Sequence, residues 1–455
     1  MSIQDKVLKS FNPATGDLVG ELPVDSLEMI QEKVEAAHRA QEEWGRMKIE
    51  DRAKMIAPFA NSLMEKVEEI AELLTKEQGK TLVEAMGEVK ACANNVESEL
   101  ESVINALKPE KLTNGPDKSQ ILFDPLGVVV SITPWNFPIL MPQWHLLPAL
   151  MAGNSVIIKP SEETTLTAKA YIEILQSHLP NGVLQMVVGD GVQGQQLIDQ
   201  NIQLTVFTGS RDVGQKIMEQ SSSHLKRVIL ELGGKDPLVV LSSADLDKAV
   251  GFAVQNSFRN CGQVCVSTER ILVSEDVYDN FLEKFSSEAK KLKYGNGLDH
   301  GVSMGSMIHG RQKAKVLEQV EDAVAKGAKV YFGETQAEGN FLGPIILTEV
   351  NDSMEILDGE TFGPVVYVDK FKSTEELVNK VNSSRYGLGA AIFGAETPAT
   401  EIATQLKTGM VGINRGVSGV KDTPWVGAKE SGFGFHHSHH GHRQFTQTRV
   451  ITVRS

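Results

Sequence analysis

Short apolar runs alternate with helix-length segments along most of the chain after residue 127. In the first part of this region the apolar runs are 128–132, 155–158, 183–188, 204–207 and 227–230. After Gly234 they recur at 238–241, 271–273, 330–332, 365–368 and 410–413. Apolar strands separated by helices are typical of βαβ units and parallel sheets. The pattern predicts an α/β fold with two doubly wound α/β domains that meet between Glu231 and Gly234.

The first 125 residues follow a different pattern. Residues 11–24 predict a hairpin with its turn at Thr15-Gly16. Asp25-Ser26 then predicts the start of a helix. A second helical region is expected from about 50 to 75, a third is expected to continue through 103, and 119–123 is expected to form a strand.

Composition excludes several classes of partner. The net charge is −14 and the isoelectric point is near 5.4, which does not suit a nucleic acid or an anionic membrane surface. Three cysteines in 455 residues indicate a reducing compartment rather than a disulfide framework. The start of the chain has no apolar signal region, and no uncharged stretch of 18 apolar residues occurs. We therefore expect a cytoplasmic protein with no membrane or nucleic-acid partner.

Two cysteines stand four residues apart in Phe258-Arg-Asn-Cys-Gly-Gln-Val-Cys265, between an apolar run and a strand. Gly262 and Gln263 break the apolar pattern just before Cys265, so a thiol there can be exposed while its flanks hold it in place. Cys265 is then either a nucleophile or one of two buried structural cysteines, because free cysteine packs as a small hydrophobe. A nucleophile would need a base, an oxyanion donor and a cofactor from elsewhere in the chain.

Polar residues follow three strands of the first predicted sheet. Asn136, in a proline-rich turn, can donate hydrogen bonds from its amide or can bond its own backbone as an Asx-turn. Lys159 and Glu162 end the next strand, where doubly wound sheets bind ligands, although Ser161 and the acids after it also fit a helix N-cap. Ser210 lies between a strand and a helix start, where backbone N–H groups can bind a phosphate. The G-x-G-x-x-G dinucleotide fingerprint is absent.

Glu231 closes the first sheet, between an apolar strand and Gly233-Gly234. This position does not suit a helix, and its surroundings are too apolar for a solvated face. The glycines allow close approach of the backbone. We therefore interpret Glu231 as a candidate general base with a raised pKa.

Five of the eleven histidines lie between His436 and His442. Imidazole is a common metal ligand. No cysteine or acidic ligand is near in the sequence, however, so we expect no metal site and interpret the segment as a polar region at a subunit contact.

Seven motifs together resemble those of the NAD(P)-dependent aldehyde dehydrogenase superfamily. They occur in the family's order and at its spacings, including 34 residues from glutamate to cysteine, and the resemblance extends over essentially the whole chain. The motifs are Pro134-Trp-Asn-Phe-Pro138, Lys159-Pro-Ser-Glu162, Phe207-Thr-Gly-Ser210, Glu231-Leu-Gly-Gly234, Gly262-Gln-Val-Cys265, Glu360-Thr-Phe-Gly-Pro364 and Lys429-Glu-Ser-Gly432.

The resemblance implies three catalytic residues. Cys265 would attack the aldehyde carbonyl as a thiolate. Asn136 and the backbone N–H of Cys265 would stabilise the tetrahedral oxyanion. Glu231 would activate the water that releases the acid from a thioester. Cys261 would need no role beyond packing.

The resemblance also implies a cofactor site in which Lys159 and Glu162 hold the adenosine ribose. Ser210 would bind a phosphate, and Glu360 and Phe362 would contact the nicotinamide ribose and ring. The implied cofactor residues are Thr133, Pro134, Trp135, Lys159, Ser161, Glu162, Gly209, Ser210, Val213, Leu232, Gly233, Glu360 and Phe362. A 2′-phosphate beside the Glu162 carboxylate would suffer like-charge repulsion, so we expect NAD as the cofactor and disfavour NADP. The retained Glu231 favours hydrolysis over transfer to coenzyme A.

The substrate pocket departs from the pattern of the succinate-semialdehyde enzymes, which this chain resembles in layout. Those enzymes usually carry an arginine where this chain has Trp144. Met141, Trp144 and Trp425 would instead form an aromatic, apolar tunnel for an aliphatic or aromatic aldehyde. Arg415, expected near the pocket mouth, leaves succinic semialdehyde open as the alternative.

We therefore expect an aldehyde dehydrogenase built from three parts. A Rossmann-like NAD-binding domain would span 1–106 and 126–233, and a catalytic domain would span 234–433. Residues 107–125 and 434–455 would form a small β oligomerisation element, so a homodimer or homotetramer is expected. The rival interpretation is a catalytically silent member of the family that serves as a binding or structural protein.

Overall fold

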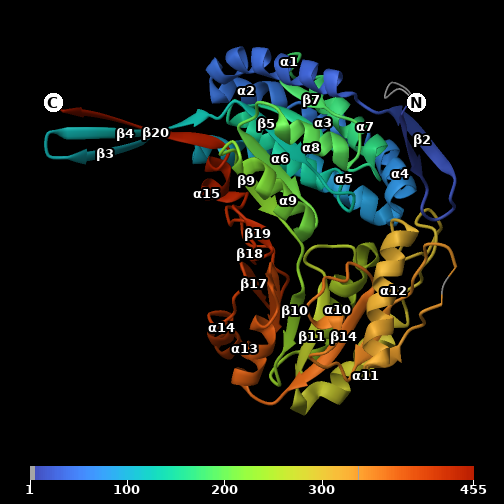
Figure 1. The fold of residues 1–455 in the computed structure, drawn as a ribbon. Coiled ribbons are helices and arrows are strands. Elements are labelled where there is room, and N and C mark those ends of the chain that lie inside the picture. The colour runs from blue at the N-terminus through green and yellow to red at the C-terminus, as the bar shows by residue number, and fades with distance from the viewer. Residues whose placement is uncertain (1–5, 337, 455) are drawn as a thin grey trace.

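Two largely parallel sheets, one from each half of the chain, form the body of the protein in the computed structural model, which describes residues 6–336 and 338–454 (Figure 1). The first sheet has the strand order β19-β9-β8-β5-β6-β7. Its strands are β5 (Val128–Ile132), β6 (Ser155–Lys159), β7 (Leu184–Met186), β8 (Leu204–Thr208), β9 (Arg227–Glu231) and β19 (Gly432–Phe433). All neighbouring strands are parallel except β19, which pairs antiparallel with β9.

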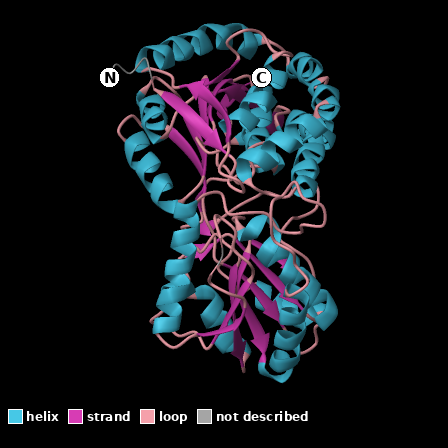
Figure 2. Ribbon diagram, turned by 90° about the vertical axis from the view of Figure 1, so that its right-hand side faces the viewer, coloured by secondary structure: helices cyan, strands magenta, loops and turns pink. Residues whose placement is uncertain are grey.

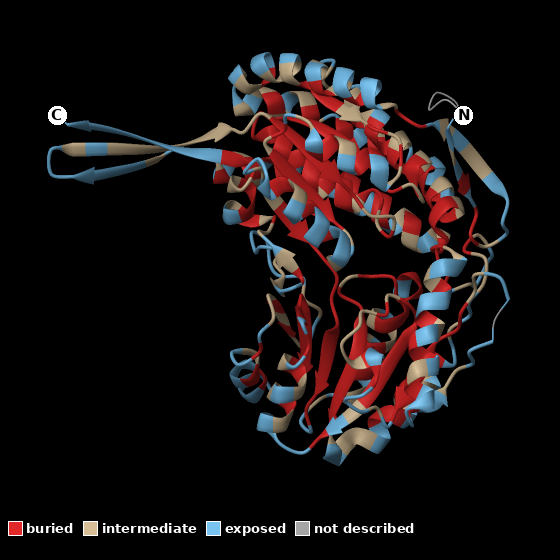
Figure 3. Ribbon diagram, in the orientation of Figure 1, coloured by how far each residue is buried: buried red, intermediate tan, exposed pale blue. Residues whose placement is uncertain are grey.

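The second sheet has the order β12-β13-β14-β11-β10-β16-β17, and among these strands β12 alone is antiparallel to its neighbour. Its strands are β10 (Asp236–Val240), β11 (Thr268–Ser274), β12 (Lys329–Phe332), β13 (Ile345–Thr348), β14 (Val365–Phe371), β16 (Gly389–Phe393) and β17 (Met410–Ile413). The central strands of both sheets are buried (Figure 3), as expected for parallel strands that are covered on both faces.

Helices cover both faces of the first sheet. They are α1 (Leu27–Arg46), α2 (Ile49–Ile56), α3 (Phe59–Glu65), α4 (Val67–Gln78), α5 (Leu82–Ala106), α6 (Leu140–Met151), α7 (Thr165–Gln176), α8 (Gly191–Asp199) and α9 (Arg211–Ser222). The Ser26 side chain caps α1, and Thr81 and Glu84 form a capping box at the start of α5. The region expected to be one helix from 50 to 75 is three helices, which break at Pro58 and Lys66.

The second sheet has its own helices. They are α10 (Leu246–Phe258), α11 (Tyr278–Ala289), α12 (Gly310–Ala325), α13 (Thr374–Asn382) and α14 (Glu396–Ala403), with short 3₁₀ turns at Arg259–Gly262, Glu275–Val277 and Glu355–Leu357. Loops gather between the two sheets (Figure 2). The strands of the first sheet end and those of the second begin in this zone: β9 ends at Glu231 and β10 starts at Asp236.

Three smaller elements complete the fold. The expected N-terminal hairpin is formed by β1 (Val7–Phe11) and β2 (Leu18–Pro23). An arm of β3 (Glu110–Asn114), β4 (Asp117–Pro125) and β20 (Thr446–Arg454) projects from the first sheet (Figure 1). The helix α15 (Ser438–Arg443) precedes β20, and β15 (Tyr386–Gly387) pairs with β18 (Ala428–Lys429).

The predicted α/β fold with two parallel sheets is confirmed. The exact domain boundaries stay a prediction. The sequence pattern did not predict β3, β13, β16 or β20. None of the helices formed by the described residues is long and apolar enough to cross a membrane.

Candidate active site

A cavity of about 290 Å³ lies between the two sheets, and Cys265 is part of its wall. Most of the residues that the sequence singled out meet here, although they come from segments far apart in the chain. Those that line the cavity are Pro134, Trp135, Asn136, Met141, Trp144, Gly209, Ser210, Leu232, Gly233, Cys265, Glu360, Phe362 and Trp425.

The loop that presents Cys265 has an unusual backbone. Asn260, Cys261 and Gly262 have φ values of 50°, 56° and 69°, so three consecutive residues adopt the left-handed conformation. Gly262 is required here because a Cβ atom would collide with the carbonyl group of Gly363. The Asn260 N–H donates to Glu84 Oε1 at 2.6 Å, which ties the loop to the start of α5. The strained turn is thus held from outside.

A buried ion pair holds the turn that carries Asn136. Lys80 Nζ lies 2.6 Å from Glu88 Oε2 and donates to the Asn136 carbonyl at 2.8 Å. Glu88 Oε1 accepts hydrogen bonds from the backbone N–H groups of Ile139 and Leu140, both at 3.1 Å. The pair therefore holds this turn at two points.

The Asn136 side chain faces the cysteine loop. Its Nδ2 donates to the Gln263 carbonyl at 3.0 Å. An amide nitrogen carries two N–H groups, so the second remains available to an oxyanion in the cavity. Gln263 is itself fixed, because its Oε1 accepts from the Ile308 N–H at 2.9 Å.

Cys265 is half-buried among carboxyl groups. Burial, followed by the charges of Asp236, Glu360 and Glu231, raises the pKa of its thiol to about 12, and Arg259 opposes this rise. The thiol is therefore protonated at neutral pH in this state and needs either a base or an added positive charge to become a nucleophile.

Glu231 is buried, and neither of its carboxyl oxygens has a hydrogen-bond partner among the described residues. Burial raises its pKa well above the usual value. Its backbone is fixed on both sides: the Glu231 carbonyl accepts from the Gly209 N–H at 3.0 Å, and Glu231 pairs with Gly432 of β19. His436 lies close to the carboxyl group, with its Nε2 3.6 Å from Glu231 Oε1.

A second buried ion pair supports the loop of Glu360 and Phe362. Lys235 Nζ lies 2.6 Å from Glu269 Oε2, and Glu269 accepts the N–H groups of Thr361 and Phe362, both at 2.8 Å. Phe362 has a φ of 53° and its ring contacts Trp135 edge-on at 5.4 Å. Burial and the charge of Glu269 raise the pKa of Glu360 to about 7.

The other predicted cofactor residues do not line the cavity that holds Cys265. Thr133, Lys159 and Ser161 are buried: Lys159 is the last residue of β6, and Thr133 and Ser161 follow the carboxyl ends of β5 and β6. Val213, on α9, is 43% exposed. Lys159 Nζ is 3.8 Å from the half-exposed Glu162 carboxylate.

This edge of the first sheet fits a nucleotide. Ser210 is the N-cap of the twelve-residue helix α9, and its side chain makes no capping hydrogen bond among the residues that the structure describes, so its hydroxyl and the first N–H groups of the helix can bind a phosphate. The buried Thr133 hydroxyl also has no partner among the described residues.

The predicted substrate residues separate into two groups. Met141, Trp144 and Trp425 line the cavity, and the two tryptophan rings lie 5.3 Å apart. These tryptophans also line a neighbouring cavity of about 500 Å³. Arg415 lines neither of these cavities: it is exposed, and its guanidinium donates to the Ser418 carbonyl at 2.6 Å. A role for Arg415 at the pocket mouth therefore stays a prediction.

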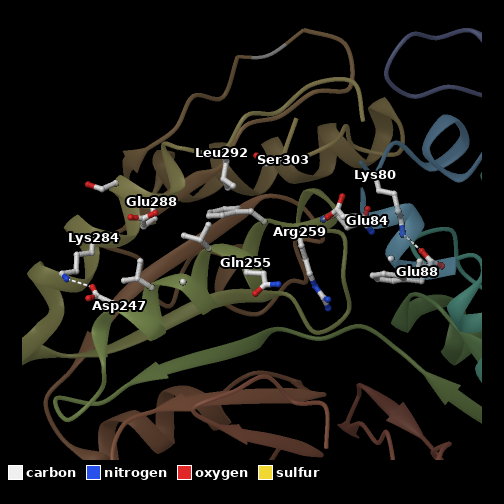
Figure 4. A pocket seen from close by; sticks show the side chains of 18 of the residues that line it. Lys80, Glu84, Glu88, Asp247, Gln255, Arg259, Lys284, Glu288, Leu292 and Ser303 are labelled. Atoms are coloured by element: carbon white, nitrogen blue, oxygen red, sulfur yellow. Dashed lines mark hydrogen bonds and ion pairs between the residues drawn. The ribbon is translucent and has the colours of Figure 1, made fainter. Parts of the chain in front are cut away.

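Sequence reasoning missed Arg259, six residues before Cys265. It lines the Cys265 cavity and also a larger cavity of about 1170 Å³ between α5, α10 and α11. In Figure 4 its side chain lies between Gln255 and the pair of Lys80 and Glu88. No hydrogen bond or ion pair joins its guanidinium to any residue that the structure describes. The arginine within the cysteine motif was the signal that could have revealed it.

Part of the histidine segment is buried within the chain itself, and its expected place at a subunit contact stays a prediction. His436 and His442 are buried within the chain, because β19 and α15 pack against the first sheet and α5. The stretch between them contains exposed and half-exposed residues. Within the described part of the chain, no group of three or more histidine, cysteine or acidic residues is placed to hold a metal ion.

The fold and cavity define an α/β enzyme with a cysteine, and with a buried glutamate whose carboxyl oxygens accept no hydrogen bond from the described residues, between two largely parallel sheets. The model of the aldehyde dehydrogenase family matches residues 1–451, and the chain belongs to that family. This confirms the aldehyde dehydrogenase predicted from the motifs, an oxidoreductase that uses a pyridine nucleotide and a cysteine.

The chain is similar to characterised members of the family along nearly its whole length. It is 36% identical over 453 residues to the glutarate-semialdehyde dehydrogenase of Pseudomonas putida, which covers 98% of this chain and 94% of that protein. It is 36% identical over 449 residues to the NADP(+) succinate-semialdehyde dehydrogenase GabD of Escherichia coli, covering 97% and 93%. A crystal structure of aldehyde dehydrogenase from Brucella melitensis biovar abortus has a TM-score of 0.95 at 36% identity, covering 99% and 94%.

Proposed function

We propose that this enzyme oxidises its aldehyde through Cys265, with Asn136 and Glu231 as the other catalytic residues. The observation that carries this proposal is that Cys265 and Asn136 line one cavity while buried Glu231 contributes to the electrostatics of the thiol. Cys265 attacks the carbonyl carbon, and the free N–H of the Asn136 amide and the Cys265 backbone N–H stabilise the oxyanion. A bound pyridine nucleotide would supply the hydride acceptor, and Cys265 is left acylated.

Glu231 completes the reaction in this proposal. Its raised pKa makes it a suitable proton acceptor for a water molecule that attacks the thioester. The C–S bond then breaks, the carboxylic acid leaves, and Cys265 is restored. Because neither carboxyl oxygen of Glu231 has a hydrogen-bond partner in the described part of the chain, the carboxyl group is free to rotate toward the water.

The cofactor would lie along the carboxyl ends of β5, β6 and β8. Pro134, Trp135, Gly209, Leu232 and Gly233 would line the cleft, and Ser210 with the start of α9 would bind the pyrophosphate. Lys159 and Glu162 would hold the adenosine ribose, and Glu360 and Phe362 the nicotinamide end. We infer NAD rather than NADP because the half-exposed Glu162 carboxylate would repel a 2′-phosphate. The related GabD is an NADP(+) enzyme, so this preference needs a direct test.

The substrate that the cavity suits best is an aldehyde with an anionic group at its far end. Arg259 offers five N–H donors in a fixed fork that matches a carboxylate, and no described residue occupies them. Both relatives named above act on semialdehydes of dicarboxylic acids. Trp144 and Trp425 would contact the carbon chain between the aldehyde and the acid group.

An unsubstituted aliphatic or aromatic aldehyde is the second candidate. It is favoured by the two tryptophans, Met141 and Leu140, which make most of the wall apolar. In that case Arg259 would bind no part of the substrate.

A panel of succinic semialdehyde, glutaric semialdehyde, hexanal and benzaldehyde, with NAD and with NADP, separates these candidates. We expect kcat/KM to be highest for one of the two semialdehydes. In Arg259→Met, kcat/KM should fall about 100-fold for the semialdehydes but not for hexanal or benzaldehyde, because the loss of a charged contact typically has about this effect. Arg415→Met is the matched control and should leave all four substrates unchanged. Equal losses for hexanal and glutaric semialdehyde would reject a role for Arg259 in substrate binding. If no aldehyde gave NADH or NADPH, the silent-member interpretation would stand.

We also propose that the enzyme is a cytoplasmic homodimer or homotetramer. The arm of β3, β4 and β20 exposes Leu112, Val450, Ile451 and Val453, each between 46% and 60%. Apolar side chains on a projecting sheet are suited to pairing with another copy. Sedimentation of the native chain and of Ile451→Lys would test this.

A further inference from the structure

We propose that His436 is a positioning residue that takes the proton from Glu231 after thioester hydrolysis and passes it through His437 to water in the neighbouring cavity. This inference rests on the proposed function, because it assigns the route by which the catalytic base is reset. It concerns two histidines whose role the sequence left unexplained.

His436 and Glu231 face one another, and no other described residue forms a hydrogen bond with either side chain. Nε2 of His436 lies 3.6 Å from Glu231 Oε1, and the side chains are 1% and 4% exposed. Both carboxyl oxygens and both ring nitrogens lack a hydrogen bond among the described residues. Leaving such groups unpaired in the interior is costly unless they serve a purpose. The gap is about 0.6 Å longer than a hydrogen bond, and a small rotation of the Glu231 carboxyl would close it.

The backbone holds His436 firmly against the base. The Trp425 N–H donates to the His436 carbonyl at 3.0 Å, and the His436 N–H donates to the Trp425 carbonyl at 3.4 Å. Gly441 of α15 packs directly on His436, where a Cβ atom would not fit beside its backbone. His436 is thus fixed between the loop of Trp425 and α15, and its ring approaches Glu231.

A left-handed turn brings the next histidine to the same side. Neighbouring residues in an extended chain point to opposite faces. His437 has a φ of 58° and Ser438 a φ of 62°, and as a result the rings of His436 and His437 lie only 4.8 Å apart. His437 lines the cavity of about 500 Å³, together with Glu99 and His442. Water in that cavity can accept the proton from His437.

The histidines are neutral, because burial lowers the pKa of His436 well below its usual value, so a proton passes along them only if each ring releases one proton as it receives another. The ionisable groups that face His436 are Glu231 on β9, His145 on α6, and His437 and His442 of the tail. Burial lowers the pKa of His437 to about 4 and that of His442 to about 3. A neutral imidazole has one acceptor and one donor nitrogen, so it can receive a proton at one and release it at the other. The Glu231 O–H bond breaks as an N–H bond forms on one ring nitrogen of His436. The N–H bond on the other nitrogen of His436 breaks as one forms on His437, whose own second N–H bond then breaks as its proton passes to water.

Pre-steady-state kinetics of His436→Gln test the proposal. The amide fills the space but cannot carry a proton. We expect a burst close to one NADH per active site at the native rate, followed by a steady state about 100-fold slower, as for a lost acid–base group. His436→Ala should regain activity when imidazole is added. His439→Gln, in the helix α15 that follows His436 and 43% exposed, should behave as the native enzyme.

Hydrolysis of p-nitrophenyl acetate in the absence of nucleotide tests the relay independently of aldehyde oxidation. Cys265 attacks the ester, p-nitrophenolate leaves, and water then releases acetate from the thioester. His436→Gln should keep the p-nitrophenolate burst and lose turnover. If His436→Gln turned over within twofold of the native rate, the relay would be overturned. If the variant lost the burst as well as turnover, His436 would have a structural role, which would also overturn the relay. An absent NADH signal in the native enzyme would instead contradict the proposed function.

Discussion

Lys80 and Glu88 form an ion pair 2.6 Å long inside the protein, and between them they hold both the carbonyl of Asn136 and the two N–H groups that follow it at 139 and 140. Both side chains are at most 2% exposed. The position of the oxyanion donor therefore depends on two residues from a different part of the chain, at the start of α5.

Removing one member of this pair should cost far more than removing a surface pair. In Lys80→Met the Glu88 carboxylate is left buried and uncompensated, and we expect the free energy of unfolding to fall by about 3–5 kcal/mol. Lys54→Met, which breaks an exposed pair with Asp51, should leave the free energy of unfolding nearly unchanged. Chemical denaturation of the three proteins measures both effects.

The double variant Lys80→Met/Glu88→Gln separates the effect of this ion pair on stability from its effect on kcat. A neutral amide oxygen can still accept the two N–H groups, so much of the stability should return. The Asn136 carbonyl stays without its lysine, so kcat should remain low. Full recovery of kcat would show that the pair serves stability alone.

The two cysteines of the loop should differ completely in their effect on turnover. Cys265→Ala should give no NADH from any aldehyde, because no thioester can form. Cys261 is buried, with its sulfur 3.5 Å from Met307 Sδ, and it does not line the cavity of Cys265. Cys261→Ala should keep kcat within a few-fold and lose about 1 kcal/mol of stability. Similar losses of turnover in both variants would contradict the assignment of the nucleophile.

Glu162 should control the choice between the two nucleotides. Replacing it with serine removes the negative charge that a 2′-phosphate would meet, so the ratio of kcat/KM for NADP to that for NAD should rise at least tenfold. Glu163→Ser is the matched control. The Glu163 carboxylate lies next in sequence but faces Arg311 and His309, so its loss should leave the ratio unchanged. A constant ratio in Glu162→Ser would contradict our account of NAD preference.

The reactivity of Cys265 should rise steeply with pH and with bound NAD. Burial and three carboxyl groups raise the pKa of the thiol to about 12, so below that value the thiolate fraction grows about tenfold per pH unit. Alkylation of Cys265 by iodoacetamide should follow this slope between pH 7 and 9. The positive nicotinamide ring should lower the thiol pKa and speed alkylation. A rate that is flat above pH 7 without NAD would show a thiolate already formed.

Apolar patterning predicted the strands of the first sheet well because they are buried on both faces, as in 128–132, where every residue is buried. It missed β13, although all four of its residues are buried, and it missed β16, which begins with Gly389 and two alanines. These strands become recognisable only through their neighbours in the sheet.

In the candidate active site, too, local sequence pattern predicted some positions and not others. Asn136 and Ser210 reach the cavity because the carboxyl ends of parallel strands meet at one edge, so their position followed from local pattern. His436 reaches Glu231 only through the pairing of β19 with β9, and Lys80 reaches Asn136 only through the packing of α5 on α6. The residues next to His436 and Lys80 in the sequence do not indicate these contacts.

The antiparallel pairing of Gly432 with Glu231 also bears on how the protein is made. The edge strand of the first sheet is synthesised roughly 200 residues after the strand that it covers. At about 5–20 residues per second on the ribosome, this edge stays open for roughly 10–40 s. During that time Glu231 has neither its strand partner nor its histidine, so a nascent chain that has already folded its first sheet still cannot complete a turnover.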